Sequence, residues 1–130
     1  MILGIGIDIC DIQRVDKVLL KYGNRFKKKC FTKNEIIKCN KVINSSACFA
    51  KRFSAKESVS KALGTGIRQG VNWKNIEIIN LISGKPKVVL KGKALEALKK
   101  ILPKNKQPNI SITITDDRGL AQSLVIIEAI

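Results

Sequence analysis

The chain of 130 residues contains no histidine. Catalytic triads of the Ser-His and Cys-His types and histidine-ligated zinc sites all need an imidazole, so these sites are excluded within this chain. Any catalysis must therefore rest on carboxylates, lysines, hydroxyl groups or a bound metal ion.

The sequence also lacks a long apolar run and a secretion signal. No uninterrupted apolar stretch approaches the roughly 20 residues that a membrane-spanning helix needs. The first residues, MILGIGIDIC, lack the basic start and the small-residue cleavage site of a signal peptide. We therefore expect a cytoplasmic protein that does not bind membranes. The cysteines are too scattered for a CxxC metal site, and we expect them all to be reduced structural thiols: Cys10, Cys30, Cys39 and Cys48.

Acidic residues are scarce, because 10 Asp and Glu face 25 Lys and Arg and the formal net charge is +15. Such a charge attracts anionic partners, which include nucleic acid, acidic proteins and phosphorylated ligands. A biased genome composition can also enrich lysine, so part of this charge carries no functional information. The apolar fraction of 45% argues against disorder, and the length predicts one domain spanning residues 1–130.

The residue patterns predict an α+β fold in which helices pack on a mainly antiparallel sheet. Apolar residues alternate with glycine and polar residues near the start of the chain, which is typical of a strand. Caps and breakers indicate helices, among them one that starts at 44–46 and ends near Leu63. The expected strands are 1–12, 76–81, 86–91, 109–115 and 120–130, and the expected helices are 12–22, 33–43, 45–63 and 93–102.

Two carboxylates stand out in this basic chain. Asp8 shares a strand face with two glycines and a small thiol, which leaves room beside the carboxylate. Glu57 lies one helical turn before Lys61, and taken alone this pair is a surface ion pair worth about 0.2–0.5 kcal/mol. Taken together, Asp8 and Glu57 could hold a Mg²⁺ ion that keeps several waters and binds substrate phosphates.

Basic residues and glycines surround Glu57 and suggest phosphate contacts. Lys51, Arg52 and Lys56 lie on the same predicted helix and could pair with phosphates. The segment Gly64-Thr65-Gly66 could bring backbone N–H groups to an anion, although glycine after a helix is more often a C-cap.

Three segments resemble, in order and spacing, the holo-[acyl-carrier-protein] synthases, which are small 4'-phosphopantetheinyl transferases. They are GIGIDICDIQRV at the start, FAKRFSAKESVSKALGTGI in the middle and GKP at 84–86. The resemblance covers nearly the whole chain, and three ordered motifs are far more specific than any one of them.

The resemblance implies the 4'-phosphopantetheinyl transferase fold and a Mg²⁺-dependent reaction that supports fatty acid biosynthesis. The enzyme would move 4'-phosphopantetheine from coenzyme A to a serine of apo acyl carrier protein and release 3',5'-ADP. Asp8 and Glu57 would bind the metal, for which Mn²⁺ is also permitted, and Lys61 would complete the catalytic set. A metal-bound water or Glu57 could take the serine proton. Coenzyme A contacts are implied for Arg52, Lys61, Gly64, Thr65, Gly66, Lys85 and Pro86.

The resemblance also implies partners. Basic residues would meet the acidic carrier protein, namely Arg14 and, as weaker assignments, Lys17, Lys21 and Arg25. Family members of this size are typically homotrimers with active sites between subunits, which agrees with sheet edges that need covering.

This sequence departs from the family in one place. A histidine that the family commonly carries near the penultimate strand is replaced here by Ser111 or by Asn109, depending on the alignment. Its role in binding or proton transfer is therefore in doubt for this chain. The alternatives to a transferase are a nucleic-acid-binding module and a basic protein–protein adaptor; the few aromatic residues, 5% of the chain, argue against the first.

Overall fold

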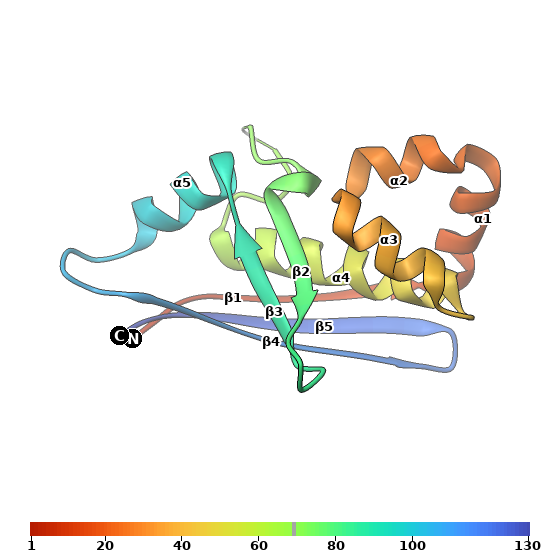
Figure 1. The fold of residues 1–130 in the computed structure, drawn as a ribbon. Coiled ribbons are helices and arrows are strands. Elements are labelled where there is room, and N and C mark those ends of the chain that lie inside the picture. Colours follow the sequence, from red (N-terminus) through yellow and green to blue (C-terminus); the bar gives the residue numbers. More distant parts are fainter. Residues whose placement is uncertain (69) are drawn as a thin grey trace.

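The computed structural model describes residues 1–68 and 70–130 as an α+β fold. Every expected strand and helix is present within a few residues of its predicted bounds (Figure 1). Two further elements, α2 and the short 3₁₀ helix η1, were not predicted. The elements are β1 (Ile2–Asp11), α1 (Ile12–Tyr22), α2 (Asn24–Cys30), α3 (Lys33–Lys41), α4 (Ser45–Leu63), η1 (Trp73–Asn75), β2 (Ile76–Asn80), β3 (Pro86–Leu90), α5 (Gly92–Ile101), β4 (Pro108–Asp117) and β5 (Leu120–Ala129).

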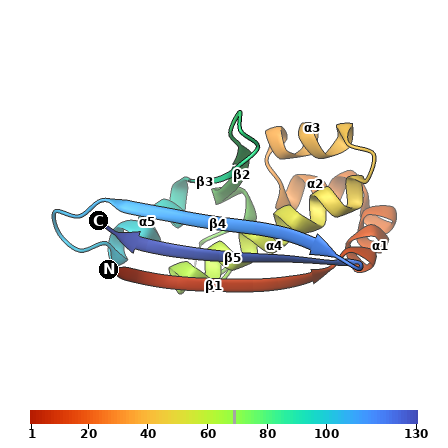
Figure 2. The same ribbon diagram turned by 90° about the horizontal axis from the view of Figure 1, so that it is seen from below.

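The strands form two antiparallel sheets. The long strands make a three-stranded sheet in the order β1-β5-β4, and β2 pairs only with β3 in a hairpin. Helices lie on one face of the long sheet, and no element of the described chain covers its other face (Figure 2). The prediction of antiparallel pairing is therefore confirmed, with the strands divided between two sheets.

Contact between β1 and α4 decides which face of β1 is buried. A Cβ atom on Gly4 would lie 1.9 Å from the Ala62 carbonyl oxygen, and one on Gly6 would lie 1.8 Å from that of Ser58. Glycine therefore lets the helix backbone reach the strand. Most of the room that the glycines leave is filled by α4, and the isoleucines on the opposite face of β1 are more than half exposed.

Local caps explain the helix bounds. The Asp11 side chain accepts hydrogen bonds at the start of α1, and Thr32 and Glu35 form a capping box at the start of α3. The Asn44 side chain caps α4, which ends at Gly64 in the left-handed conformation with φ +82°. These caps agree with the predicted helix ends.

The core contains a disulfide that the sequence did not predict. Cys39 at the end of α3 and Cys48 at the start of α4 are bonded, with their Cα atoms 5.4 Å apart. The expectation that all cysteines are reduced is therefore wrong for this pair, because folding brings together two residues that sequence spacing left unrelated. Cys10 and Cys30 carry free thiols.

No helix within residues 1–68 and 70–130 combines the length and apolar character that crossing a bilayer requires.

Candidate active site

Asp8 occupies a place where β1 meets α4. Its side chain is 16% exposed, and its Oδ1 lies 3.1 Å from Nζ of Lys61. The same Nζ donates to the Ile7 carbonyl oxygen at 2.9 Å. Ser54 in α4 also donates to the backbone carbonyl of Asp8 at 3.1 Å. The helix thus fixes both the backbone and the carboxylate of Asp8.

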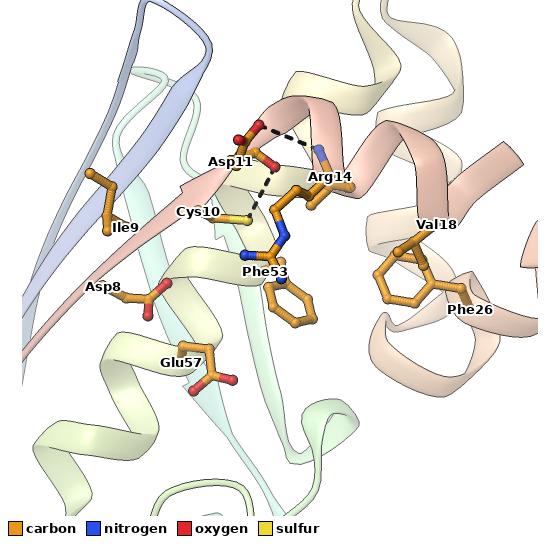
Figure 3. Close-up of a pocket in the computed structure, with 10 residues that line it drawn as sticks. Asp8, Ile9, Cys10, Asp11, Arg14, Val18, Phe26, Phe53 and Glu57 are labelled. Atoms are coloured by element: carbon orange, nitrogen blue, oxygen red, sulfur yellow. Dashed lines mark hydrogen bonds between the residues drawn. The ribbon is translucent and has the colours of Figure 1, made fainter. Parts of the chain in front are cut away.

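Glu57 projects from α4 into the same pocket as Asp8 (Figure 3). Burial raises the pKa of Glu57 above its ordinary value of 4.5, the nearby Asp8 carboxylate raises it further, and Lys61 opposes both effects. The predicted ion pair of Glu57 with Lys61 is replaced in the structure by a bond from Lys61 to Asp8. Glu57 is thus a carboxylate without a salt-bridge partner among the described residues.

The pocket beside these carboxylates has a volume of about 310 Å³. Its polar end holds Asp8 and Glu57, and the Arg14 side chain extends toward Phe53 on the other side (Figure 3). The remaining wall is largely apolar. The sequence analysis assigned only Asp8, Glu57 and Arg14 of the lining residues to a functional role. The others are Ile9, Cys10, Asp11, Val15, Val18, Phe26 and Phe53.

A second hollow of about 290 Å³ lies on the other side of Asp8 and is lined by Ile7, Ile9, Lys61 and Gln122 as well. Asp8 therefore borders both hollows, and Lys61 borders only the second. A ligand that spans the two hollows could contact Asp8 and Glu57 in the main pocket and Lys61 in the second hollow.

The donor set fits a hard divalent cation that keeps part of its water shell. Burial first and the Asp8 carboxylate second raise the pKa of Glu57, and a cation between the two carboxylates would relieve their repulsion. Among residues 1–68 and 70–130, no cluster of three or more His, Cys, Asp or Glu could enclose a metal ion. Mg²⁺ suits such an open set, because it is usually bound by one or two carboxylates together with water and substrate phosphates.

Arg52 lies apart from this pocket, beneath the β2–β3 hairpin. Its side chain is buried, and it donates to Oδ1 of Asn80 at 2.8 Å and to Sγ of Cys48 at 3.5 Å. Asn80 in turn donates to the Gly84 carbonyl at 3.0 Å, in the turn that carries Lys85 and leads to Pro86. The structure thus links Arg52 with the Lys85-Pro86 turn, two regions that the sequence assigned separately to coenzyme A.

The Gly64-Thr65-Gly66 segment directly follows the C-terminal end of α4. The N–H groups of Gly64 and Gly66 donate to the carbonyls of Lys61 and Ser60, so both close the end of the helix. The Thr65 hydroxyl donates to the Gly66 carbonyl at 2.8 Å. In this structure the segment acts as a C-cap, and a part in anion binding stays a prediction.

The structure contradicts the expectation for Lys56 and leaves that for Lys51, whose side chain is 37% exposed, as a prediction. Lys56 is fully buried and forms an ion pair with Glu35 at 2.6 Å, so the expectation that it pairs with phosphate is wrong. The reason is a partner on another helix, which the pattern of one helix does not reveal. Lys51 pairs with Asp116 at 3.4 Å.

The predicted carrier-binding residues are exposed on α1 and α2. Arg14 lines the main pocket, and Arg25 lines a neighbouring hollow of about 260 Å³ whose other residues are Val18, Tyr22, Phe26 and Lys29. Lys17 and Lys21 are exposed on α1. The structure therefore brings Arg14 and Arg25 to adjacent hollows.

The residues that replace the family histidine lie on β4, away from the main pocket. Ser111 is exposed and pairs in register with Ile126, on the uncovered side of the long sheet. Asn109 donates to Glu128 at 3.3 Å. Neither lines the pocket of Asp8 and Glu57.

Comparison with known proteins gives one consistent result. A sequence model of the 4'-phosphopantetheinyl transferase superfamily matches residues 4–117. A holo-[acyl-carrier-protein] synthase of Rhizobium leguminosarum is 52% identical over 100% of this chain and 97% of its own length. The crystal structure of a holo-[acyl-carrier-protein] synthase from Neisseria meningitidis has a TM-score of 0.85 and 32% identity, and the match covers 98% of this chain and 99% of that one.

A further solved relative carries a ligand. The Helicobacter pylori holo-[acyl-carrier-protein] synthase, crystallised in complex with coenzyme A, has a TM-score of 0.81 and 29% identity, over 95% of this chain and 99% of that one. Together, the sequence match, the fold and the paired carboxylates define the class of protein. The chain belongs to the 4'-phosphopantetheinyl transferase superfamily. Within it, the enzyme type is that of the holo-[acyl-carrier-protein] synthases, as the sequence motifs predict.

Proposed function

We propose that the protein transfers 4'-phosphopantetheine from coenzyme A to a serine hydroxyl of apo acyl carrier protein. The serine oxygen forms a bond to the phosphorus that carries the pantetheine, the bond from that phosphorus to 3',5'-ADP breaks, and the serine loses its proton. The observation that carries the proposal is the pair Asp8 and Glu57, with Lys61 beside them, at a pocket in a chain of this family.

Asp8 and Glu57 are the proposed ligands of a Mg²⁺ ion, and Mn²⁺ can replace it because oxygen ligands accept both. When bound, the ion would supply positive charge to the pyrophosphate as the leaving group departs. The pocket contributes two anionic side chains held on separate rigid elements, a strand and a helix. This arrangement keeps them in place when substrate enters.

Lys61 supplies the positive charge of the protein itself. Its side chain is 50% exposed, so the ammonium group can shift from Asp8 toward a phosphate in the second hollow. The serine proton passes to Glu57 or to a water molecule beside it. The absence of histidine is therefore compatible with the reaction.

The remaining coenzyme A contacts are proposed in two groups. Arg52, Lys85 and Pro86 form one group through Asn80 at the β2–β3 turn. The other group follows Lys61 at the end of α4 and consists of Gly64, Thr65 and Gly66. The first group offers positive charge. The second would offer the backbone N–H groups of Gly64 and Gly66 only if they leave the carbonyls of Lys61 and Ser60.

The acidic carrier protein is proposed to dock on α1 and α2. Arg14, Lys17, Lys21 and Arg25 are exposed there, and Val18 and Phe26 add an apolar floor to the hollow between them. Such contacts steer association and weaken with salt, because surface charges are screened.

A homotrimer with active sites between subunits is proposed from the uncovered sheet face. Its outer residues include Ile5, Ile7 and Ile9, which are 58%, 54% and 59% exposed, and Leu124 beside Ile7. Contiguous exposed apolar residues of this kind mark interaction sites. A cytoplasmic location, a single domain over residues 1–130 and a role in fatty acid synthesis complete the proposal.

The test is intact-mass measurement of apo acyl carrier protein incubated with this protein and coenzyme A, with Mg²⁺ and with excess EDTA. We expect a gain of one phosphopantetheine group with Mg²⁺ and none with EDTA. A folded sample that produces no gain in either condition would refute the transferase proposal, and a gain that persists in EDTA would refute the metal requirement.

A further inference from the structure

Lys56 is a buried cation that the proposed reaction does not use. Its side chain has no exposure, and its Nζ contacts Oε1 of Glu35 at 2.6 Å. The same Nζ donates to the carbonyl oxygens of Trp73 at 3.0 Å and Ile76 at 2.7 Å. All three donors of the ammonium group are therefore used, and each partner lies on a different element.

Glu35 connects this cation to two further segments. Its Oε1 accepts the N–H of Thr32 at 2.9 Å, and its Oε2 accepts the N–H of Ile78 in β2 at 2.9 Å. Lys56 and Glu35 thereby join α4 to the start of α3, to η1 and to β2. We call Lys56, Glu35 and the carbonyls of Trp73 and Ile76 the buried clamp.

The clamp reaches the pocket through one aromatic pair. The ring of Trp73 stacks on the ring of Phe53 with centroids 4.4 Å apart and planes 25° from parallel. Phe53 lines the same pocket as Asp8 and Glu57. The carbonyl that Lys56 holds therefore belongs to the residue whose ring supports the pocket wall.

We propose that Lys56 is a positioning residue, which fixes Trp73 against Phe53 and so sets the pocket wall that faces Asp8 and Glu57. Its effect on transfer rests on the proposed function, whereas its effect on the packing of Trp73 does not. The competing explanation is that the ion pair only stabilises the fold. That explanation predicts a loss of stability with no change in the aromatic pair.

The chemistry explains why a lysine is needed. A methionine at position 56 would fill similar space but would leave the buried Ile76 carbonyl without this donor and Glu35 without its cation. The partly buried Trp73 carbonyl would keep only the N–H of Ile76 as a donor. Buried groups that lose their partners are costly, so the segment 73–76 would shift to find new ones. Trp73 is part of that segment, and its ring would move with the backbone.

The first measurement uses Trp73, the only tryptophan in the chain. The variants are Lys56→Met, the double variant Lys56→Met/Glu35→Gln, which removes the stranded charge, and the control Leu98→Ala. Leu98 is buried on α5 in the core cluster that also holds Ile76, and it takes no part in the hydrogen bonds of the clamp. Fluorescence and near-ultraviolet circular dichroism are recorded on metal-free protein at a temperature where each variant is folded.

We expect both Lys56 variants to show red-shifted emission, faster acrylamide quenching and a changed near-ultraviolet spectrum, while Leu98→Ala matches the wild type. Folded Lys56 variants with wild-type Trp73 signals would overturn the proposal, whatever the protein catalyses. This readout needs neither substrate nor metal, so it stands apart from the proposed function.

The second measurement is the kinetics of transfer to the carrier protein. We expect the Lys56 variants to lose about tenfold or more in kcat, since small misplacements near reacting groups are costly, and Leu98→Ala to keep its kcat. Phe53→Leu, which leaves the ion pair of Lys56 and Glu35 intact, should show a similar loss in kcat. It is the test of the positioning role if neither Lys56 variant folds. Wild-type kcat in folded clamp variants or in Phe53→Leu overturns the positioning role. An inactive wild type would refute the proposed function instead. The Trp73 fluorescence and circular dichroism measurements would then be the test of the clamp.

Discussion

At the scale of single residues, the site depends on how one lysine and two acids share charge. Lys61 pairs with Asp8 and leaves Glu57 without an ion-pair partner among the described residues, in a partly buried place where burial and Asp8 raise its pKa. This is an unfavourable arrangement for the metal-free protein. The proposed metal ion would offset it, so stability and activity should respond in opposite directions when Glu57 is neutralised.

Glu57→Gln tests this directly. Below pH 4.5 the wild-type carboxyl is protonated in both the folded and unfolded chains, and as the pH rises through the raised pKa the folded state loses stability. Metal-free Glu57→Gln should therefore melt at a higher temperature than the wild type at pH 7 and at a similar temperature near pH 4. Transfer should fall at least about 100-fold, the upper range for residues that merely support a metal ligand. A lower melting temperature at pH 7 would contradict the account.

The thiol of Cys10 lies close to the same carboxylates, which affect its pKa. Burial raises the pKa of its thiol to about 11 from 9.0, and the carboxylates of Asp8, Asp11 and Glu57 add to this effect while Arg14 opposes it. In EDTA at pH 8, alkylation of Cys10 by iodoacetamide should run at about one-hundredth of the rate in the unfolded chain, because only the thiolate reacts. Peptide mass spectrometry over time measures it. Equal rates in folded and unfolded protein would show that the surroundings are not as described.

At the scale of elements, the close approach of α4 to β1 positions the site. Gly4 and Gly6 let the helix backbone reach the strand, and the same contact carries Glu57 and Lys61 to Asp8. The ends of α4 were predictable from Asn44 and Gly64, because caps depend on neighbouring residues. The extent to which α4 is buried was not predictable, because it depends on contacts with α3. Lys56 pairs with Glu35 of α3, and Cys48 is bonded to Cys39 of the same helix.

Gly6→Ala should destabilise the protein by more than about 3 kcal/mol, because its Cβ would lie 1.8 Å from the Ser58 carbonyl oxygen and backbone must move to make room. Chemical denaturation followed by Trp73 fluorescence gives the free energy of unfolding. Lys87→Ala, at an exposed position of β3, should change it by less than about 0.5 kcal/mol. If Gly6→Ala were as mild as that control, the tight helix–strand contact would be wrong.

At the scale of the whole molecule, the sheet has one face covered by helices and one face bare. Period-two alternation identified β1, but it did not tell which side would be buried, because glycines rather than isoleucines face the helix. Likewise, the ordered motifs predicted Asp8, Glu57 and Lys61 as site residues, and the structure brings these three side chains close together. The apolar pocket wall was not predicted, because it forms where separate helices meet. The bare face gives the association proposal a physical basis.

Ile7→Lys tests that proposal. Ile7 is 54% exposed opposite Leu124, and a lysine there would place charge in an apolar contact between subunits. Size exclusion with light scattering should show the wild type at three times its chain mass of 14.4 kDa and the variant at that mass, with unchanged circular dichroism. Leu20→Lys, on α1 and 80% exposed, should leave the assembly intact. A monomeric wild type at micromolar concentration would refute the trimer.

The proposed role of the Asp8–Glu57 pair is tested by the rate of phosphopantetheine mass gain on apo acyl carrier protein with Asp8→Asn, in saturating Mg²⁺ and coenzyme A. Asp117→Asn, an exposed residue outside the pocket, is the matched control. We expect Asp117→Asn to transfer at the wild-type rate and Asp8→Asn, folded to the same extent, to be at least about 100-fold slower. Full Mg²⁺-dependent transfer by Asp8→Asn would contradict the proposed role, because the carboxylate pair would then not be the site of the reaction.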